Sequence, residues 1–299
     1  MTRPARVVVV GDVITDVLAV LSGPLAIGSD TGAEISLGGG GQAANTAAWI
    51  AAQRVDVTLI SAVGDDDAGR VRVAELERAG VDCAVERVEG VPTGTVIVLA
   101  ADGERTMVSQ RGANLRLSAA HVEQALAAVP DAGHLHLSAY TLLDASSRGA
   151  GLRALAAARE RGLTTSVDAA SAAPLRRVGA RAFLGWVRDV DLLLVNADEA
   201  TVLAGGLDPA AQGRALSATA RRVVVKGGAA GAVWVDRAAT VSVATARRVT
   251  VVDVTGAGDA FAAGLLTAWL NGATSTAALD RATELGALAV SSVGARPRS

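Results

Sequence analysis

The chain has 299 residues, of which 51% are hydrophobic and only 2% aromatic, and its formal net charge is −2. This length and apolar content allow one large α/β domain whose core is built from Ala, Val and Leu. The near-neutral charge gives no electrostatic footprint for nucleic acid or an anionic membrane, and the single cysteine, Cys83, excludes an intrachain disulfide and a cysteine-rich zinc site. No stretch reaches the roughly 18 uncharged apolar residues of a membrane span, so we expect a cytoplasmic protein.

Short β-branched runs alternate with Ala-rich segments of helical spacing along the chain. The first run, residues 6–10, ends at Gly11 and is typical of a buried strand. Similar runs follow at 57–60, 96–99, 134–137, 164–167, 192–195, 223–225 and 233–235. Helices are predicted between them, over 43–53, 68–79, 119–129, 147–161 and 209–220, and two more over 256–270 and 276–290. The alternation predicts a mostly parallel sheet covered on both faces.

Two segments depart from this alternation, because 33–37 and 94–110 have an extended, hairpin-like pattern with a turn signal at Asp102-Gly103. We expect a single domain over residues 1–299 with a small β lid, contributed by about 15–39 and 91–111. Unpaired strand edges invite pairing with another chain, so a homodimer through the lid is a hypothesis.

The most informative segment, residues 253–264, is DVTGAGDAFAAG, which follows an extended run and leads into an apolar helix. The backbone N–H groups of Gly256, Ala257 and Gly258, at a helix start, would form a site for an anion. Asp259 could cap the helix, or it could act as a base toward an alcohol. An anion hole beside a carboxylate base suits phosphoryl transfer to an alcohol. The P-loop pattern and a dinucleotide-binding Gly-x-Gly-x-x-Gly after the first strand are both missing from the sequence.

This segment resembles the C-terminal signature of the PfkB (ribokinase-like) carbohydrate kinase family. The segment GGQAANTA at 40–47 resembles the N-terminal signature, and Gly64 follows at the expected distance. The resemblance extends over nearly the whole chain, including GDVITD at 11–16, NADE at 196–199 and VKGGAAG at 225–231. It implies a ribokinase-like three-layer α/β/α sandwich with a mostly parallel central sheet and a small β lid. It also implies an ATP-dependent kinase that phosphorylates a hydroxyl of a small sugar, with Asp259 as the base.

The resemblance implies a sugar site at the start of the chain. Asp16 is expected to hold sugar hydroxyls or to cap a strand end, and Asp12 to line the same pocket or cap a turn. Gln42 is expected either to reach a sugar hydroxyl or to face solvent. Arg111, with Arg105 on the same strand face, would suit a carboxylate- or phosphate-bearing sugar, although a solvated strand face is an equal alternative. The remaining expected sugar residues are Gly41 and Asn45.

The resemblance also implies sites for ATP, Mg²⁺ and K⁺. Asn196 and Glu199 are expected to organise Mg²⁺ through water, or simply to cap a helix. Residues expected beside the ATP phosphates and ribose are Lys226, Gly228 and Gly231. The positions matching a monovalent-cation site are Asp253, Thr255, Ala289, Ser292 and Gly294.

Two other functions stay open at this point. A nucleoside kinase of the same family would need aromatic side chains to stack on a base, and here Tyr140 and Trp49 are the candidates. The lid segment 94–110 has no aromatic residue, which favours a sugar. A non-catalytic ligand sensor is less favoured, because both signatures are intact.

Overall fold

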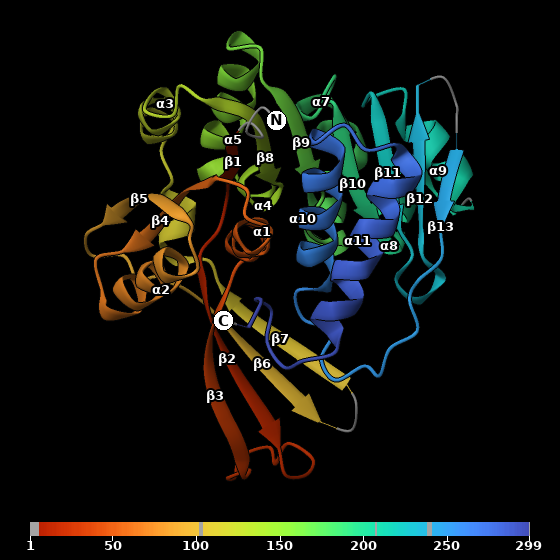
Figure 1. The fold of residues 1–299 in the computed structure, drawn as a ribbon. Coiled ribbons are helices and arrows are strands. Elements are labelled where there is room, and N and C mark those ends of the chain that lie inside the picture. Colours follow the sequence, from red (N-terminus) through yellow and green to blue (C-terminus); the bar gives the residue numbers. More distant parts are fainter. Residues whose placement is uncertain (1–5, 102–103, 207, 238–240, 299) are drawn as a thin grey trace.

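The computed structural model describes residues 6–101, 104–206, 208–237 and 241–298 (Figure 1). The turn predicted at Asp102-Gly103 lies outside the described residues. In the described part of the chain the strands form two sheets, a large central one and a smaller one that projects from it.

The central sheet has the strand order β13-β12-β11-β10-β9-β8-β1-β4-β5. All neighbouring pairs from β11 to β5 are parallel, and only β12 and β13 pair antiparallel at one edge. The strands are β1 (Arg6–Val10), β4 (Val57–Gly64), β5 (Asp82–Val88), β8 (Ala132–Ser138), β9 (Thr164–Asp168), β10 (Leu192–Asn196), β11 (Arg222–Lys226), β12 (Ala232–Asp236) and β13 (Val241–Ala244).

Helices cover both faces of this sheet, so the fold is a three-layer sandwich (Figure 1). On one face lie α1 (Gln42–Ala52), α2 (Asp67–Arg78), α10 (Ala257–Leu270) and α11 (Ser275–Val290). On the other lie α3 (Ala119–Ala127), α4 (Tyr140–Leu143), α5 (Ala145–Glu160), α6 (Ala172–Val178), α7 (Ala180–Trp186), α8 (Ala197–Ala204) and α9 (Pro209–Leu216). Short 3₁₀ turns occupy Gly112–Arg116 and Gly228–Ala230.

Strand β1 lies between the two helical layers, and this position explains its continuous run of valines. Val7 and Val9 belong to one hydrophobic core, whereas Val8 and Val10 belong to the other, because successive side chains of a strand point to opposite faces. Each of the four is fully buried. A strand covered on both faces has no position that favours a polar residue.

The smaller sheet is the lid, with the order β3-β2-β6-β7. Its strands are β2 (Ile14–Leu21), β3 (Ala33–Gly40), β6 (Gly94–Ala101) and β7 (Glu104–Gln110). Asp16 lies opposite Gly38 and Val96, and Thr15 lies opposite Gly39. Residues directly opposite each other share a face of the sheet, so Asp16 and Thr15 point to different sides of the lid.

The fold class expected from the sequence is confirmed, including the mostly parallel sheet and the β lid. The helix predicted over 209–220 ends earlier, at Leu216, because the chain turns at Ser217 toward β11. No helix within the described residues combines the length and apolarity needed to cross a bilayer.

Candidate active site

The glycine-rich turn before α10 carries Asp259 in the first turn of that helix. Gly256 has a left-handed backbone with φ 77°, and a Cβ there would come within 2.4 Å of the Ala295 carbonyl oxygen. Glycine is therefore required for the tight turn. The turn directs the backbone of Ala257 and Gly258 and the side chain of Asp259 toward the carboxyl-end edge of the sheet.

The Asp259 carboxylate accepts a hydrogen bond of 2.9 Å from Nδ2 of Asn45, the α1 residue expected in the sugar site. Burial raises the pKa of Asp259 to about 7, and the Asn45 bond opposes this shift. The negative charge of Asp168 adds to the rise, while Lys226 opposes it. A carboxyl group that titrates near neutrality suits a general base.

Asp12 follows β1 and is buried. One carboxylate oxygen accepts from the Ala43 backbone N–H (3.2 Å), and the other pairs with the Arg111 guanidinium (3.1 Å). Gly41, with φ 96°, passes directly over Asp12, since a Cβ on it would come within 2.5 Å of the Asp12 carbonyl oxygen. Asp12 thus organises the turn into α1, which was one of the two expected roles, and it also orients Arg111.

Arg111 stacks on the ring of Tyr140, with the guanidinium carbon 4.0 Å from the ring centroid. Such stacking is favourable for a delocalised cation and keeps the guanidinium plane fixed. The side chain of Arg105, the other lid arginine, lies outside the described residues. Trp49 is buried and donates to the Ala295 carbonyl oxygen (2.9 Å), so its indole belongs to the core.

Asp16 stands on β2 with its carboxylate against Gly40, where a Cβ would come within 2.2 Å of the carboxylate. Burial raises the pKa of Asp16 to about 6, and the charge of Arg296 opposes the rise. The carboxylate keeps acceptor sites for vicinal hydroxyls. The sugar-binding role of Asp16 stays a prediction.

A hydrogen-bonded chain runs from Gln42 to Lys226. Nε2 of Gln42 donates to one oxygen of Asp168 (3.1 Å), and Nζ of Lys226 donates to the other (2.5 Å). Ser138 donates to the Gln42 side-chain oxygen (2.6 Å). The side chain of Gln42 is therefore held inside the site, and the alternative of a solvent-facing side chain is wrong. Asp168 itself was missed, although its place at the end of a buried strand could have indicated it.

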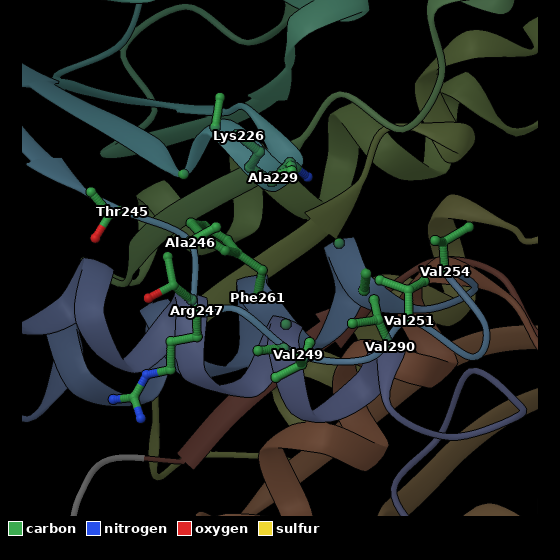
Figure 2. A pocket seen from close by; sticks show the side chains of 18 of the residues that line it. Lys226, Ala229, Thr245, Ala246, Arg247, Val249, Val251, Val254, Phe261 and Val290 are labelled. Carbon is green, nitrogen blue, oxygen red and sulfur yellow. The ribbon is translucent and has the colours of Figure 1, made fainter.

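A cavity of about 980 Å³ opens between β11, the 245–254 segment, the start of α10 and the C-terminal half of α11. Figure 2 shows Lys226 and Ala229 on one side, with Val249, Val251 and Val290 facing them. Gly228, Gly231, Ala257 and Gly258 line the same cavity. A Cβ on Gly231 would come within 2.0 Å of the Ala244 carbonyl oxygen, so only glycine fits there. Apolar walls with one lysine and exposed backbone at one end fit an adenine nucleotide.

Asn196 and Glu199 form a reciprocal capping box at the start of α8. The Glu199 oxygens accept from the backbone N–H and the side-chain amide of Asn196, both at 2.7 Å. Burial raises the pKa of Glu199 to about 7, and Lys226 opposes the rise. The described residues contain no group of three or more His, Cys, Asp or Glu placed to hold a metal ion. These contacts show the capping role, which was the alternative expected for this pair, and a Mg²⁺ site here stays a prediction.

The positions expected around a monovalent cation lie together. Asp253 accepts from the Thr255 backbone N–H (2.9 Å) and the Gly294 backbone N–H (3.1 Å). Ser292 in turn donates its backbone N–H to the Ala289 carbonyl oxygen (3.3 Å). The loop before α10 and the loop after α11 are thereby joined beside the glycine-rich turn.

A second residue that the sequence did not indicate is Arg296, in the segment after α11. Its guanidinium contacts Asn45, Gly40 and Glu75. Arg296 lies in no recognisable motif. It reaches the site because the segment after α11 packs against Gly40, where the lid strand β3 meets α1.

Known proteins resemble this chain over most of its length. The family model described as pfkB family carbohydrate kinase matches residues 4–299. An ATP-dependent ribose-1-phosphate kinase of Halopiger xanaduensis is 36% identical over 261 residues, covering 86% of this chain and 82% of that protein. A 2-dehydro-3-deoxygluconokinase of Thermoproteus tenax is 32% identical over 241 residues, covering 78% and 73%.

Solved structures share the fold. The adenosine kinase from Sinorhizobium meliloti superposes with a TM-score of 0.88 at 24% identity, covering 98% of this chain and 96% of that one. A ribokinase-type protein from E. coli, in complex with ATP and Mg²⁺, superposes with a TM-score of 0.86 at 24% identity, covering 97% and 94%. The match over nearly the entire sequence, together with the curated relatives, shows that the chain belongs to the pfkB family of carbohydrate kinases.

Proposed function

We propose that the protein transfers the γ-phosphoryl group of ATP to a hydroxyl group, specifically a hydroxymethyl, of a small sugar. The observation that carries this proposal is the position of Asp259, which borders the Ala257–Gly258 end of the nucleotide cavity and bonds to Asn45 of the sugar side. Residues 1–299 act as one kinase domain closed by the lid of β2, β3, β6 and β7.

In the proposed reaction, Asp259 takes the proton of the acceptor hydroxyl as its oxygen forms a bond to the γ-phosphorus. The bond from that phosphorus to the β–γ bridging oxygen breaks, and ADP leaves. The backbone N–H groups of Gly256 and Gly258 stabilise negative charge on the transferred group, joined by that of Ala257 once it leaves the Val254 carbonyl oxygen, to which it donates at 3.3 Å. Lys226, held by Asp168, supplies a positive charge at the phosphate end of the cavity. Asn196 and Glu199 would orient the waters of a Mg²⁺ ion bound with ATP, and that ion would neutralise phosphate charge.

The acceptor we would test first is a phosphorylated pentose. The relative named as a ribose-1-phosphate kinase is the best-matched of the curated proteins described above. In this chain Arg111 offers a fixed guanidinium, which suits a phosphate or a carboxylate. A nucleoside acceptor is less favoured, because the indole of Trp49 is buried and the ring of Tyr140 is covered by Arg111.

The test is ADP release with Mg²⁺–ATP against pentoses, pentose phosphates, hexoses, sugar acids and nucleosides, with Asp259→Asn alongside. We expect a sugar or sugar phosphate to stimulate ADP release, and the variant to lose about 10²–10⁴-fold in kcat while still binding ATP. Stimulation by nucleosides alone would overturn the sugar assignment, and full activity of Asp259→Asn would overturn the base.

We also propose a homodimer through the lid. Leu37, Val17, Ile97 and Val108 lie opposite one another across all four lid strands, so they form one apolar row on the face away from Asp16. Leu37 is 70% exposed, Val108 57% and Ile97 41%. A second copy of the same row would cover these side chains, because an isologous contact pairs like with like.

We propose, finally, that K⁺ binds beside the glycine-rich turn. The Asp253 carboxylate and the backbone carbonyl groups around Thr255, Ala289, Ser292 and Gly294 are hard oxygen atoms of the kind that such a cation prefers. Their hydrogen bonds already hold the two loops together at this place.

A further inference from the structure

Arg296 joins three parts of the site that are distant in sequence. Its Nε donates to Oδ1 of Asn45 (3.2 Å), and one terminal nitrogen donates to the Gly40 carbonyl oxygen (3.1 Å). The other terminal nitrogen lies 3.5 Å from Glu75 of α2. Figure 1 shows the C-terminal end of the chain beside α1 and the root of the lid. The side chain of Arg296 is only 15% exposed, so these contacts are shielded from solvent.

Arg296 and Asp16 lie on opposite sides of strand β3. A Cβ on Gly39 would come within 2.2 Å of the Arg296 guanidinium, whereas a Cβ on Gly40 would come within 2.2 Å of the Asp16 carboxylate. Successive residues of a strand point to opposite faces, so the backbone of this strand separates the two side chains. The charge of Arg296 still opposes the rise in the pKa of Asp16, but the hydrogen bonds of the guanidinium go to Asn45 and Gly40.

The group that it holds is the side-chain amide of Asn45. This amide stands between a guanidinium, which only donates hydrogen bonds, and the Asp259 carboxylate, which accepts them. With the carbonyl oxygen toward Arg296, the NH₂ group must point at Asp259. The flipped amide would place its oxygen against the carboxylate and its NH₂ group against the guanidinium, and both contacts would be repulsive.

We propose that Arg296 is a positioning residue for the phosphoryl transfer, which holds the Asn45 amide with its N–H directed at Asp259 and anchors the lid root through the Gly40 carbonyl. The inference rests on the proposed function, since Asp259 is its base. It extends that function by assigning a role to a residue that touches neither sugar nor nucleotide.

Charged groups surround both Asp259 and Arg296, and they contribute to the pKa of each. Asp259 faces Asp168 from β9, Lys226 from β11 and Asp12 from the end of β1, besides Asn45 from α1. Arg296 faces Glu75 and Arg72 from α2, Asp16 from β2 and Cys83 from β5. The contacts that link Arg296 to Asp259 run through the Asn45 amide.

The decisive comparison is between Arg296→Met and Arg296→Gln. Both variants remove the charge, but the amide nitrogen of Gln occupies the place of the arginine Nε and can still donate to Asn45. The pKa of Asp259 is followed in the ligand-free protein by the ¹³Cγ chemical shift, over about two pH units on either side of neutrality. We expect Arg296→Met to raise this pKa by about one unit, and Arg296→Gln to raise it by less than about half a unit.

A coupling test shows whether the effect passes through Asn45. In an Asn45→Ala background, Arg296→Met should leave the pKa of Asp259 unchanged, because the intermediate amide is gone. Arg237→Met is the control, since this arginine also pairs with one carboxylate, Asp189 at 2.9 Å, on a remote surface. Circular dichroism and thermal unfolding of every variant check that each is folded.

An unchanged titration in Arg296→Met, equal shifts in the Met and Gln variants, or a shift that persists in the Asn45→Ala background would each overturn the proposal. The titration needs no acceptor, so its outcome is separate from the proposed function. That function fails instead if none of the acceptors tested stimulates ADP release by the unaltered protein. If the positioning role and the kinase function are both correct, the acid-side decline of kcat in Arg296→Met should shift to higher pH together with the pKa of Asp259. KM for ATP should stay within about twofold.

Discussion

Nδ2 of Asn45 donates a hydrogen bond of 2.9 Å to the Asp259 carboxylate, joining two residues that are 214 positions apart in the sequence. The bond connects the first turn of α1 with the first turn of α10, so the N-terminal and C-terminal glycine-rich segments meet at one carboxylate. It places a neutral donor on a base whose surroundings otherwise raise its pKa. The acid–base behaviour of the enzyme should follow from this contact.

Turnover should therefore decline on the acid side of neutrality. The pKa of Asp259 is raised to about 7, and only the carboxylate form can accept the acceptor proton. The active fraction is consequently lost as the pH falls through about 7, and kcat should then decrease about tenfold per pH unit. A pH–rate profile at saturating ATP and acceptor measures this. A flat profile down to about two units below neutrality would exclude Asp259 as a base with this pKa.

Much of the site could be predicted from sequence because its residues stand in compact segments. Gly256 must adopt a left-handed turn and Gly41 must pass over Asp12, so glycine at both positions follows directly from the backbone. These constraints are local, so they appear in the sequence as glycines at fixed positions within short motifs. The β-branched strands of the central sheet could be predicted for a similar reason, since most of their residues are buried on both faces.

Other parts left no such pattern. Strand β5 was not predicted, because Asp82, Glu86 and Arg87 interrupt its apolar residues at the sheet edge, where one side meets solvent. Asp168 and Arg296 gain their importance from partners far away in sequence, Lys226 in one case and Asn45 in the other. Neither has flanking residues that indicate those partners, so only the assembled fold brings them into view.

The ion pair of Lys226 and Asp168 should be costly to break from one side. Asp168 is 2% exposed and Lys226 12%, so removing the lysine leaves a buried carboxylate that accepts from the Gln42 amide and the Ala170 backbone N–H, both neutral donors. We expect Lys226→Met to lower the free energy of unfolding by about 3 kcal/mol, and Lys226→Met with Asp168→Asn to recover most of that loss. Urea unfolding measures the free energy of unfolding of the single and the double variant. Equal stability of the single and double variants would argue that the pair is not energetically coupled, and ATP affinity should fall in both.

Two glycines of strand β3 offer a matched pair of substitutions. A Cβ on Gly40 would meet the Asp16 carboxylate, whereas a Cβ on Gly38 meets nothing within 4 Å. Gly40→Ala should displace Asp16 and raise KM for the acceptor about tenfold or more, since small misplacements of binding groups are expensive. Gly38→Ala should change KM by less than about twofold. Equal behaviour of the two variants would remove Asp16 from the acceptor site.

The proposed cation site predicts a response to K⁺ at constant ionic strength. Replacing choline chloride by potassium chloride should raise kcat and the melting temperature, because an ion that binds only the folded site stabilises it. Asp253→Ala should abolish both responses, since its carboxylate connects Thr255 with Gly294. Identical rates in the two salts would rule out a functional role for the ion at this position.

The lid face provides the test of assembly. Static light scattering of the unaltered protein should give the mass of a dimer, and Leu37→Glu should give that of a monomer, because the new charge enters the apolar row at its β3 end, opposite Val17. Ile27→Glu is the matched control, since Ile27 is 90% exposed in the connection between β2 and β3 and lies outside the row. Its mass should stay that of a dimer. A monomeric mass for the unaltered protein at micromolar concentration would overturn the proposed dimer. Loss of the dimer in both variants would show that the contact is not confined to this row.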